Sequence, residues 1–385
     1  MTKKIFIVAL ALLGTFEIGF SQSKLVKTAT KNLSSQSLDK AVEAINEAIK
    51  DPESMYSANT WIVRGRVYMG VAANAFFARN YVNAEDSAYA SFLKALELDL
   101  SDKNQILVSL EWPKLALAYY NKGADKFQEK KYNEATSAFE KSAVLSEKNG
   151  ALDTSAIFNI ALSAANDDQL EKAAEKYQFL VDCKYPMMGI YTGLGDVYFR
   201  LDKKKEAEQI AALLVERFGE DSIAYTSAAA INLRLGNNEK AEKILSEALA
   251  KWATTPSLYL YIGIAYENGN QENKAEAAYK KALELNPEYK EAVYNLGAFY
   301  VNKGIKIKSE ADNLPLEETQ KYEKGQALAN EALNKAIPYL EKVIATQPDN
   351  IDAMTTLKGI YTHLRKTEEA KKMQEKIDAL GATKQ

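Results

Sequence analysis

Apolar residues recur along the chain at helical spacing, in pairs of segments that are separated by short polar turns. The clearest pair lies between residues 259 and 287. One face of its first segment carries Tyr259, Ile262, Gly263 and Tyr266. After the turn formers Gly269 and Asn270, the second segment carries Ala275, Tyr279 and Ala282. This spacing predicts two amphipathic helices that form a hairpin, which ends at Pro287.

An alanine marks the second helix of each predicted pair, and its spacing reveals an internal repeat. The series is Ala41, Ala88, Ala135, Ala173, Ala207, Ala241, Ala275, Ala336 and Ala370. Four of the eight intervals are 34 residues long. A fixed period of this length is typical of stacked helix hairpins, each of which buries its apolar face against its neighbours. The longer intervals carry insertions, which we place at about residues 70–86, 101–115 and 301–330.

Each insertion has its own expected structure. In the first, we expect the preceding helix to run on through Phe77. In the second, Pro113 is well placed to begin a helix. The third should form two prolonged helices that join near Leu314–Pro315, with Pro338 kinking the second helix or shifting its start.

The residues that recur in each unit resemble the tetratricopeptide repeat, in which an aromatic residue, Leu-Gly, Tyr, Ala, Phe and Pro follow at set offsets. Partial matches occur at Tyr191, Leu194, Gly195 and Tyr198, and at Tyr294, Leu296, Gly297 and Tyr300. The resemblance covers residues from about 24 to 380. The members of the family that the chain resembles are exported bacterial proteins. It implies an all-α fold over residues 23–385, a right-handed α-solenoid of about nine helix hairpins with inserted or elongated helices.

The resemblance also implies a binding surface, because the first helix of each hairpin lines a concave groove that holds peptides in that family. The groove residues would be Arg66, Tyr120, Asn121, Phe158, Asn159, Phe199, Arg200, Arg234, Tyr261, Tyr294 and Asn295. Their rings would supply apolar area and their amides hydrogen bonds. The alternative for each ring is that it packs against an adjacent helix. The Lys and Asn pair with which one subclass clamps a C-terminal carboxylate is absent from the early units.

Residues 1–22 are predicted to be a secretory signal peptide. Lys3 and Lys4 precede an apolar run that ends in a small-residue exit around Ser21. No apolar run of transmembrane length follows, so we expect a soluble protein in the periplasm or outside the cell. The formal net charge of −3 argues against a nucleic-acid partner.

Signals for catalysis, metals or cofactors are weak. His363 is the only histidine, which excludes a zinc cluster built from histidines, and we interpret it as a residue at the end of a helix. Cys183 is the only cysteine, so there is no internal disulfide, and we expect it to be a buried filler. No nucleophile elbow, phosphate-binding loop or dinucleotide fingerprint is present, so no cofactor is expected.

Three functions follow, in decreasing order of support. The leading hypothesis is an exported, non-catalytic scaffold that binds peptide segments of a partner protein in the cell envelope. The second is a structural component that assembles with copies of itself through the arm at residues 301–335. The third is an enzyme that cleaves envelope glycans with two carboxylates, although the spacing of the 52 acidic residues singles out no pair.

Overall fold

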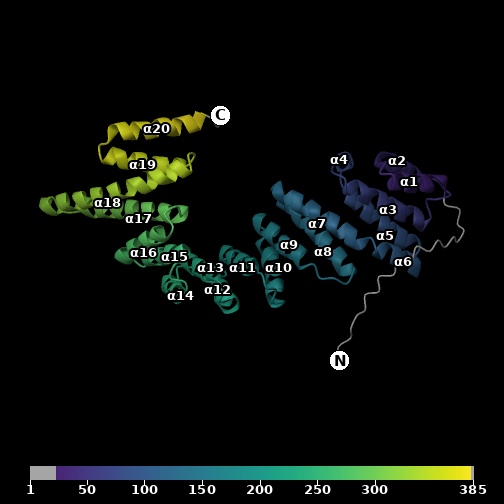
Figure 1. Ribbon diagram of the computed structural model, residues 1–385, viewed down its shortest axis with the longest axis horizontal. Coiled ribbons are helices and arrows are strands. Elements are labelled where there is room, and N and C mark those ends of the chain that lie inside the picture. Colours follow the sequence, from purple (N-terminus) through teal and green to yellow (C-terminus); the bar gives the residue numbers. More distant parts are fainter. Residues whose placement is uncertain (1–22, 383–385) are drawn as a thin grey trace, which may run out of the picture. The chain divides into compact units, whose positions relative to one another are not determined.

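The computed structural model describes residues 23–382, and every regular element within this range is an α-helix (Figure 1). The predicted signal peptide at residues 1–22 lies outside the described residues. The chain divides into two compact units, Met1–Asp168 and Gln169–Gln385. In both units consecutive helices pack as hairpins, so the predicted all-α array is confirmed.

The first unit holds three hairpins, which α1 forms with α2, α3 with α5, and α7 with α8. Its helices are α1 (Lys24–Ser34), α2 (Leu38–Ala48), α3 (Ala58–Ala72), α4 (Ala75–Ala78), α5 (Ala84–Leu98), α6 (Asp102–Ser109), α7 (Trp112–Gln128), α8 (Tyr132–Lys148) and α9 (Thr154–Asn166). Pro113 lies in the first turn of α7, as predicted.

One expectation for this unit is wrong, because α3 does not continue through Phe77. It ends at Ala72, and the separate helix α4 begins at Ala75. The side chain of Asn74 accepts hydrogen bonds from the backbone N–H groups of Phe76 and Phe77, which starts a new helix there.

The second unit begins with α10 and continues as five hairpins. Its helices are α10 (Leu170–Asp182), α11 (Met188–Arg200), α12 (Lys204–Phe218), α13 (Ser222–Arg234), α14 (Asn238–Lys251), α15 (Pro256–Asn268), α16 (Glu272–Leu285), α17 (Lys290–Asp312), α18 (Thr319–Thr346), α19 (Ile351–His363) and α20 (Thr367–Ala382). The first helices α11, α13, α15 and α17 also pack on one another in succession.

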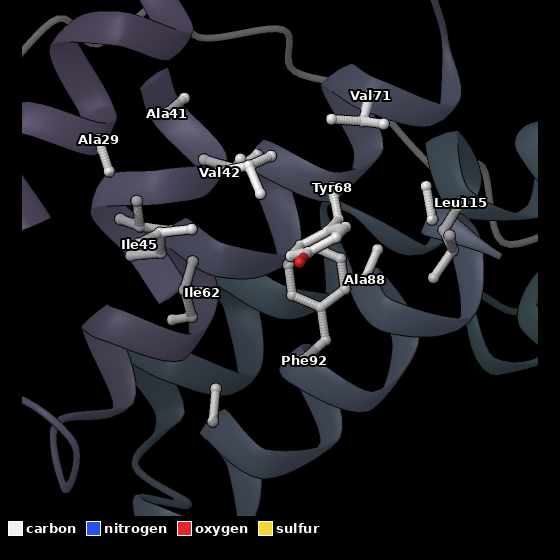
Figure 2. Close-up of a cluster of buried hydrophobic side chains, with 14 of the residues drawn as sticks. Ala29, Ala41, Val42, Ile45, Ile62, Tyr68, Val71, Ala88, Phe92 and Leu115 are labelled. Carbon is white, nitrogen blue, oxygen red and sulfur yellow. The ribbon is translucent and has the colours of Figure 1, made fainter. Parts of the chain in front are cut away.

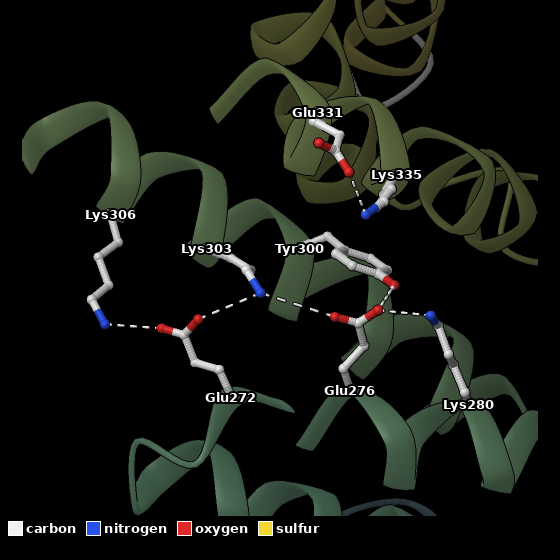
Figure 3. A network of polar contacts seen from close by, with 8 residues as sticks. All are labelled: Glu272, Glu276, Lys280, Tyr300, Lys303, Lys306, Glu331 and Lys335. Carbon is white, nitrogen blue, oxygen red and sulfur yellow. Dashed lines mark hydrogen bonds and ion pairs between the residues drawn. The ribbon is translucent and has the colours of Figure 1, made fainter. Parts of the chain in front are cut away.

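The long hairpin α17–α18 is the most individual element of the second unit. Its helices are joined around Leu314 and Pro315, as predicted from the sequence. Pro338 lies inside α18, so this helix neither starts nor ends there. The base of the hairpin is held to α16 by charged groups, since Lys306 lies 2.9 Å from Glu272 and Lys303 lies 3.5 Å from the same carboxylate (Figure 3).

The marker alanines lie where the two helices of a hairpin are in close contact. Eight of the nine, all except Ala370, have no exposed surface. In α15–α16 a Cβ atom added to Gly263 would lie only 2.6 Å from the ring of Tyr279. Small residues on one helix therefore allow an aromatic ring of the other to fill the crossing.

The same rule builds the core of the first unit (Figure 2). Phe92 of α5 is completely buried and packs beside Gly65 of α3, where a side chain would overlap its ring. Ile45 and Ile62, each at most 1 % exposed, extend this core across α2 and α3. Burying one such side chain contributes about 1.5–3 kcal/mol relative to leaving it in water.

Candidate peptide-binding surface

The first helices of the second unit carry six of the predicted groove residues. Because α11, α13, α15 and α17 pack in succession, residues at equivalent positions of these helices lie on one surface, together with residues one helical turn before them. We call this surface the first-helix face. Its members are Asp196, Phe199 and Arg200 on α11, Ala230, Leu233 and Arg234 on α13, Ile264 on α15, and Tyr294 on α17.

At the α11–α13 end of this face, two predicted arginines approach one carboxylate, and the predicted Phe199 packs against one of them. Arg234 donates a hydrogen bond from Nη1 to Oδ1 of Asp196 over 2.6 Å, and its guanidinium lies 4.1 Å from the ring centroid of Phe199. Arg200 lies 3.7 Å from the other oxygen of Asp196. Two guanidinium groups on neighbouring helices therefore meet at the same carboxylate.

At the other end of the face, Tyr294 stands beside a hollow of about 400 Å³. Tyr294 is 50 % exposed, so a large part of the residue is accessible to a ligand. Lys342 and Thr346 of α18 and Asn350, which caps α19, line the other walls. The side chain of Asn295 also lines the hollow but donates to the backbone oxygen of Glu291 over 2.7 Å.

The first unit contains a hollow of the same construction, with a volume of about 350 Å³. Tyr120 of α7 takes the place of Tyr294, and the capping residue of α9, Asp153, takes the place of Asn350. Here the ring is engaged within the protein. Its hydroxyl accepts a hydrogen bond from Asn159 over 2.8 Å, and its centroid lies 5.3 Å from that of Phe139. Tyr120 therefore matches the alternative of packing against neighbouring helices.

The other predicted residues are dispersed. Arg66 donates from Nε to Glu111 over 2.8 Å, and the side chain of Glu111 is only 5 % exposed. A buried carboxylate needs such a partner, so Arg66 stabilises the start of α7. Asn121 is exposed, while Phe158 and Tyr261 are half-buried.

His363 and Cys183, which lie outside the face, each had an expected position in the fold. His363 is the last residue of α19, as expected, and its Nε2 lies 2.9 Å from Oδ1 of Asn330. The expectation that Cys183 is buried is wrong, because α10 ends one residue before it and leaves the thiol exposed. In residues 23–382 there is no group of three or more His, Cys, Asp or Glu that could hold a metal ion.

Sequence reasoning missed two parts of the surface. Asp196, which joins the two arginines, lies one helical turn before Arg200, and that spacing was an available signal. Lys342 and Asn350 come from α18 and α19, and no pattern along the chain links them to Tyr294. None of the helices in the described range is sufficiently long and apolar to cross a membrane.

Comparison with known proteins identifies one repeat directly and gives several distant structural likenesses. Residues 256–289, which contain α15 and α16, match the family model of the tetratricopeptide repeat. No curated protein matches the chain.

Among solved structures, MamA is 19 % identical over 46 % of this chain and 93 % of its own, with a TM-score of 0.38. YrrB, described as a tetratricopeptide-repeat protein with an unusual peptide-binding site, is 16 % identical over 53 % of this chain and 96 % of its own, with a TM-score of 0.36. TTC0263, a thermophilic protein of Thermus thermophilus, is 21 % identical over 46 % of this chain and 94 % of its own, with a TM-score of 0.35.

The matched repeat has neighbours that are built in the same way. The hairpins α11–α12 and α13–α14 repeat the 34-residue period of α15–α16, and each buries its marker alanine completely. Residues 256–289 are therefore a tetratricopeptide repeat, which lies in a series of hairpins with the same period.

Proposed function

We propose that the protein is an exported, non-catalytic scaffold that binds a peptide segment of a partner protein along the first-helix face of the second unit. The observation that carries this proposal is the exposed ring of Tyr294 beside its hollow of about 400 Å³. Exposed aromatic residues next to a pocket are the side chains that most often dominate the free energy of protein association.

The rest of the face suits an extended ligand. Ala230, Leu233 and Ile264 are half-buried and offer apolar area between Tyr294 and the arginines. Packed helices lie about 9 Å apart, so four of them span about 30 Å. An extended peptide rises about 3.3 Å per residue, and about ten residues would cover the face.

Helical backbone cannot recognise such a peptide by itself. The main-chain N–H and C=O groups of the four helices are bonded within each helix except at its ends. Recognition therefore depends on the side chains of the face, which would contact both the main chain and the side chains of the peptide. This dependence makes single substitutions on the face informative.

The export part of the proposal is supported by the sequence of residues 1–22 alone. A basic start, an apolar run and a small-residue exit are typical of a cleaved secretory signal. Expression of the full chain in a Gram-negative host, followed by fractionation and N-terminal sequencing, tests it. A new N-terminus near Ser21 in the periplasmic fraction is expected, and uncleaved protein in the cytoplasm would contradict export.

The binding part is tested by panning the purified protein against a displayed library of random peptides of about ten residues. Recovered peptides should bind the Tyr294→Ala variant about tenfold more weakly, since a buried aromatic anchor is worth more than about 1.4 kcal/mol. Tyr322→Ala is the matched control, because Tyr322 of α18 is similarly exposed, at 43 %, but lies outside the face. Failure to recover any peptide, or equal losses in both variants, would contradict the proposal.

A specific observation keeps self-assembly as a second candidate. The arm at residues 301–335 exposes several apolar side chains, which are Ile305, Leu316, Tyr322 and Leu328. Leu316, at the tip between α17 and α18, is 95 % exposed. An arm that exposes several large apolar side chains is a candidate protein interface.

A further inference from the structure

We propose that the α11–α13 end of the first-helix face binds carboxylate side chains, so that the recognised peptide segment is acidic. This inference rests on the proposed function and adds the chemical class of the ligand. It is carried by the arrangement of Arg200 and Arg234 around Asp196 and Phe199.

The guanidinium of Arg234 is held in place before any ligand arrives. Phe199 supports it from one side at 4.1 Å, and Asp196 accepts one of its five N–H donors over 2.6 Å. The side chain nevertheless remains 43 % exposed. A planar guanidinium that is fixed on a ring loses little conformational freedom when it binds a carboxylate through two parallel hydrogen bonds.

The charge pattern favours an anionic ligand at this place. Asp196 accepts only one N–H of Arg234, so the other donors of this half-exposed guanidinium can bind a carboxylate, and Arg200 adds a second guanidinium 3.7 Å from Asp196. The residues that correspond to these arginines on the next two first helices are Asn268 and Asn302, which are exposed and uncharged. The positive side chains of this row are therefore confined to α11 and α13, and they would orient a peptide by its acidic end.

Apolar groups of α13, one beside the cluster and one about three turns before it, favour a peptide over a simple anion. Leu233 is half-buried next to Arg234, and Ile223, near the start of the same helix, is 59 % exposed. An acidic segment with interspersed apolar residues would use both kinds of surface. This chemistry differs from capture of a free C-terminal carboxylate, which needs no acidic side chains.

The panning experiment also tests this inference when each peptide is fused through its C-terminus to the display protein, so that it has no free C-terminal carboxylate. Peptides recovered by the wild-type protein should be enriched in Asp and Glu over the starting library. The Arg200→Met/Arg234→Met double variant should lose that enrichment. Recovered acidic peptides should also bind it about tenfold or more weakly, and replacing their Asp and Glu by Asn and Gln should cause a similar loss in the wild-type protein.

A matched control separates ligand binding from the general effect of removing an arginine. Arg217 of α12 lies over the ring of Tyr191 at 5.8 Å, in a contact of the same type but on the second helix of its hairpin. Arg217→Met should leave the enrichment and the affinities unchanged. Circular dichroism should show the same helicity for all variants.

The possible failures are distinguishable. Recovery of peptides without acidic enrichment, or with enrichment that survives the double variant, would overturn this inference while the proposed function stands. Recovery of no peptide at all would overturn both. Binding that needs a free C-terminus, seen only with synthetic peptides, would also overturn the assignment to side-chain carboxylates.

Discussion

Left-handed backbone at one position of most turns between paired helices is a recurring feature at the scale of single residues. A residue with positive φ stands five positions before eight of the nine marker alanines. These residues are Gln36, Asn83, Lys130, Asp168, Asp202, Gly236, Asn270 and Arg365. Only one of them is glycine, although the left-handed conformation costs other residues about 1–2 kcal/mol. The turns therefore store strain that the packing of the hairpins offsets.

Gly236→Ala should lower the free energy of unfolding by about 1 kcal/mol. Its φ is +78°, and a Cβ atom there would meet nothing within 4 Å, so the effect comes from the backbone alone. Gly359→Ala is the matched control, since a Cβ atom there also meets nothing but the residue lies inside α19. It should raise the free energy by a similar amount, because alanine is the better helix former. Urea denaturation of both variants measures these changes in the free energy of unfolding. Two changes in the same direction would contradict the account.

Gly263→Ala should destabilise the matched repeat through packing. The added methyl group would lie 2.6 Å from the ring of Tyr279, and an overpacked core typically costs about 1–3 kcal/mol. The double variant Gly263→Ala/Tyr279→Leu should recover part of the loss relative to the sum of the two single changes. If denaturation experiments show that the two losses of stability are additive, overlap with the ring of Tyr279 is not the cause of the destabilisation.

Ionic contacts act at the scale of elements, where they hold the long α17–α18 hairpin to α16 (Figure 3). Hydrogen bonding from Lys306 lowers the pKa of Glu272. Burial by itself would raise the pKa of Glu276, but hydrogen bonds from Lys280 and Tyr300 hold it below its usual value. Both carboxylates therefore favour the docked hairpin while they are ionised.

This arrangement makes the docking sensitive to acid. A carboxylate whose pKa is lower in the folded state stabilises that state above its unfolded pKa of about 4.3, and the contribution is lost as the pH falls through the folded pKa. Wild-type protein should therefore be more stable than Glu272→Gln at pH 7, and the difference should shrink as the pH falls below about 4.3. Thermal unfolding at several pH values measures it, and a difference that is independent of pH would contradict the role of these charges.

Much of each element could be predicted from sequence because small residues and turn formers act locally. The marker alanines located the second helices, and Pro113 and Leu314–Pro315 located a helix start and a connection. The break after Ala72 was missed because it depends on the side chain of Asn74 capping a four-residue helix. The first-helix face was predicted only in part. Asp196 pairs with arginines on two helices, and the hollow at Tyr294 is lined by residues from three helices and their caps.

At the scale of the whole molecule, the two compact units differ in what they offer a partner. In the first, Tyr120 is bonded to Asn159 and Arg66 to Glu111, so these three predicted groove residues are engaged within the protein. In the second, Tyr294 and Arg234 remain substantially exposed on one face. This difference is the reason that we propose peptide binding on the second unit.

Self-assembly, the second candidate, predicts a change in mass when the arm is altered. Leu316→Lys with Leu328→Lys places two charges on its exposed apolar surface, so a dimer should dissociate. The mass of the wild-type protein by light scattering should then exceed that of one chain, which is 42.8 kDa before any cleavage, and the variant should return to the mass of one chain. A monomeric wild-type protein would end this candidate and leave peptide binding untouched.

The central claim is that a peptide segment lies on the first-helix face of the second unit. Photo-crosslinking tests it most directly, with benzoylphenylalanine placed at position 294 or, in a matched protein, at position 322, and with a peptide recovered by panning as the ligand. The account predicts an efficient crosslink from position 294 and little from position 322. Equal crosslinking at both positions, or crosslinking from position 322 alone, would contradict it.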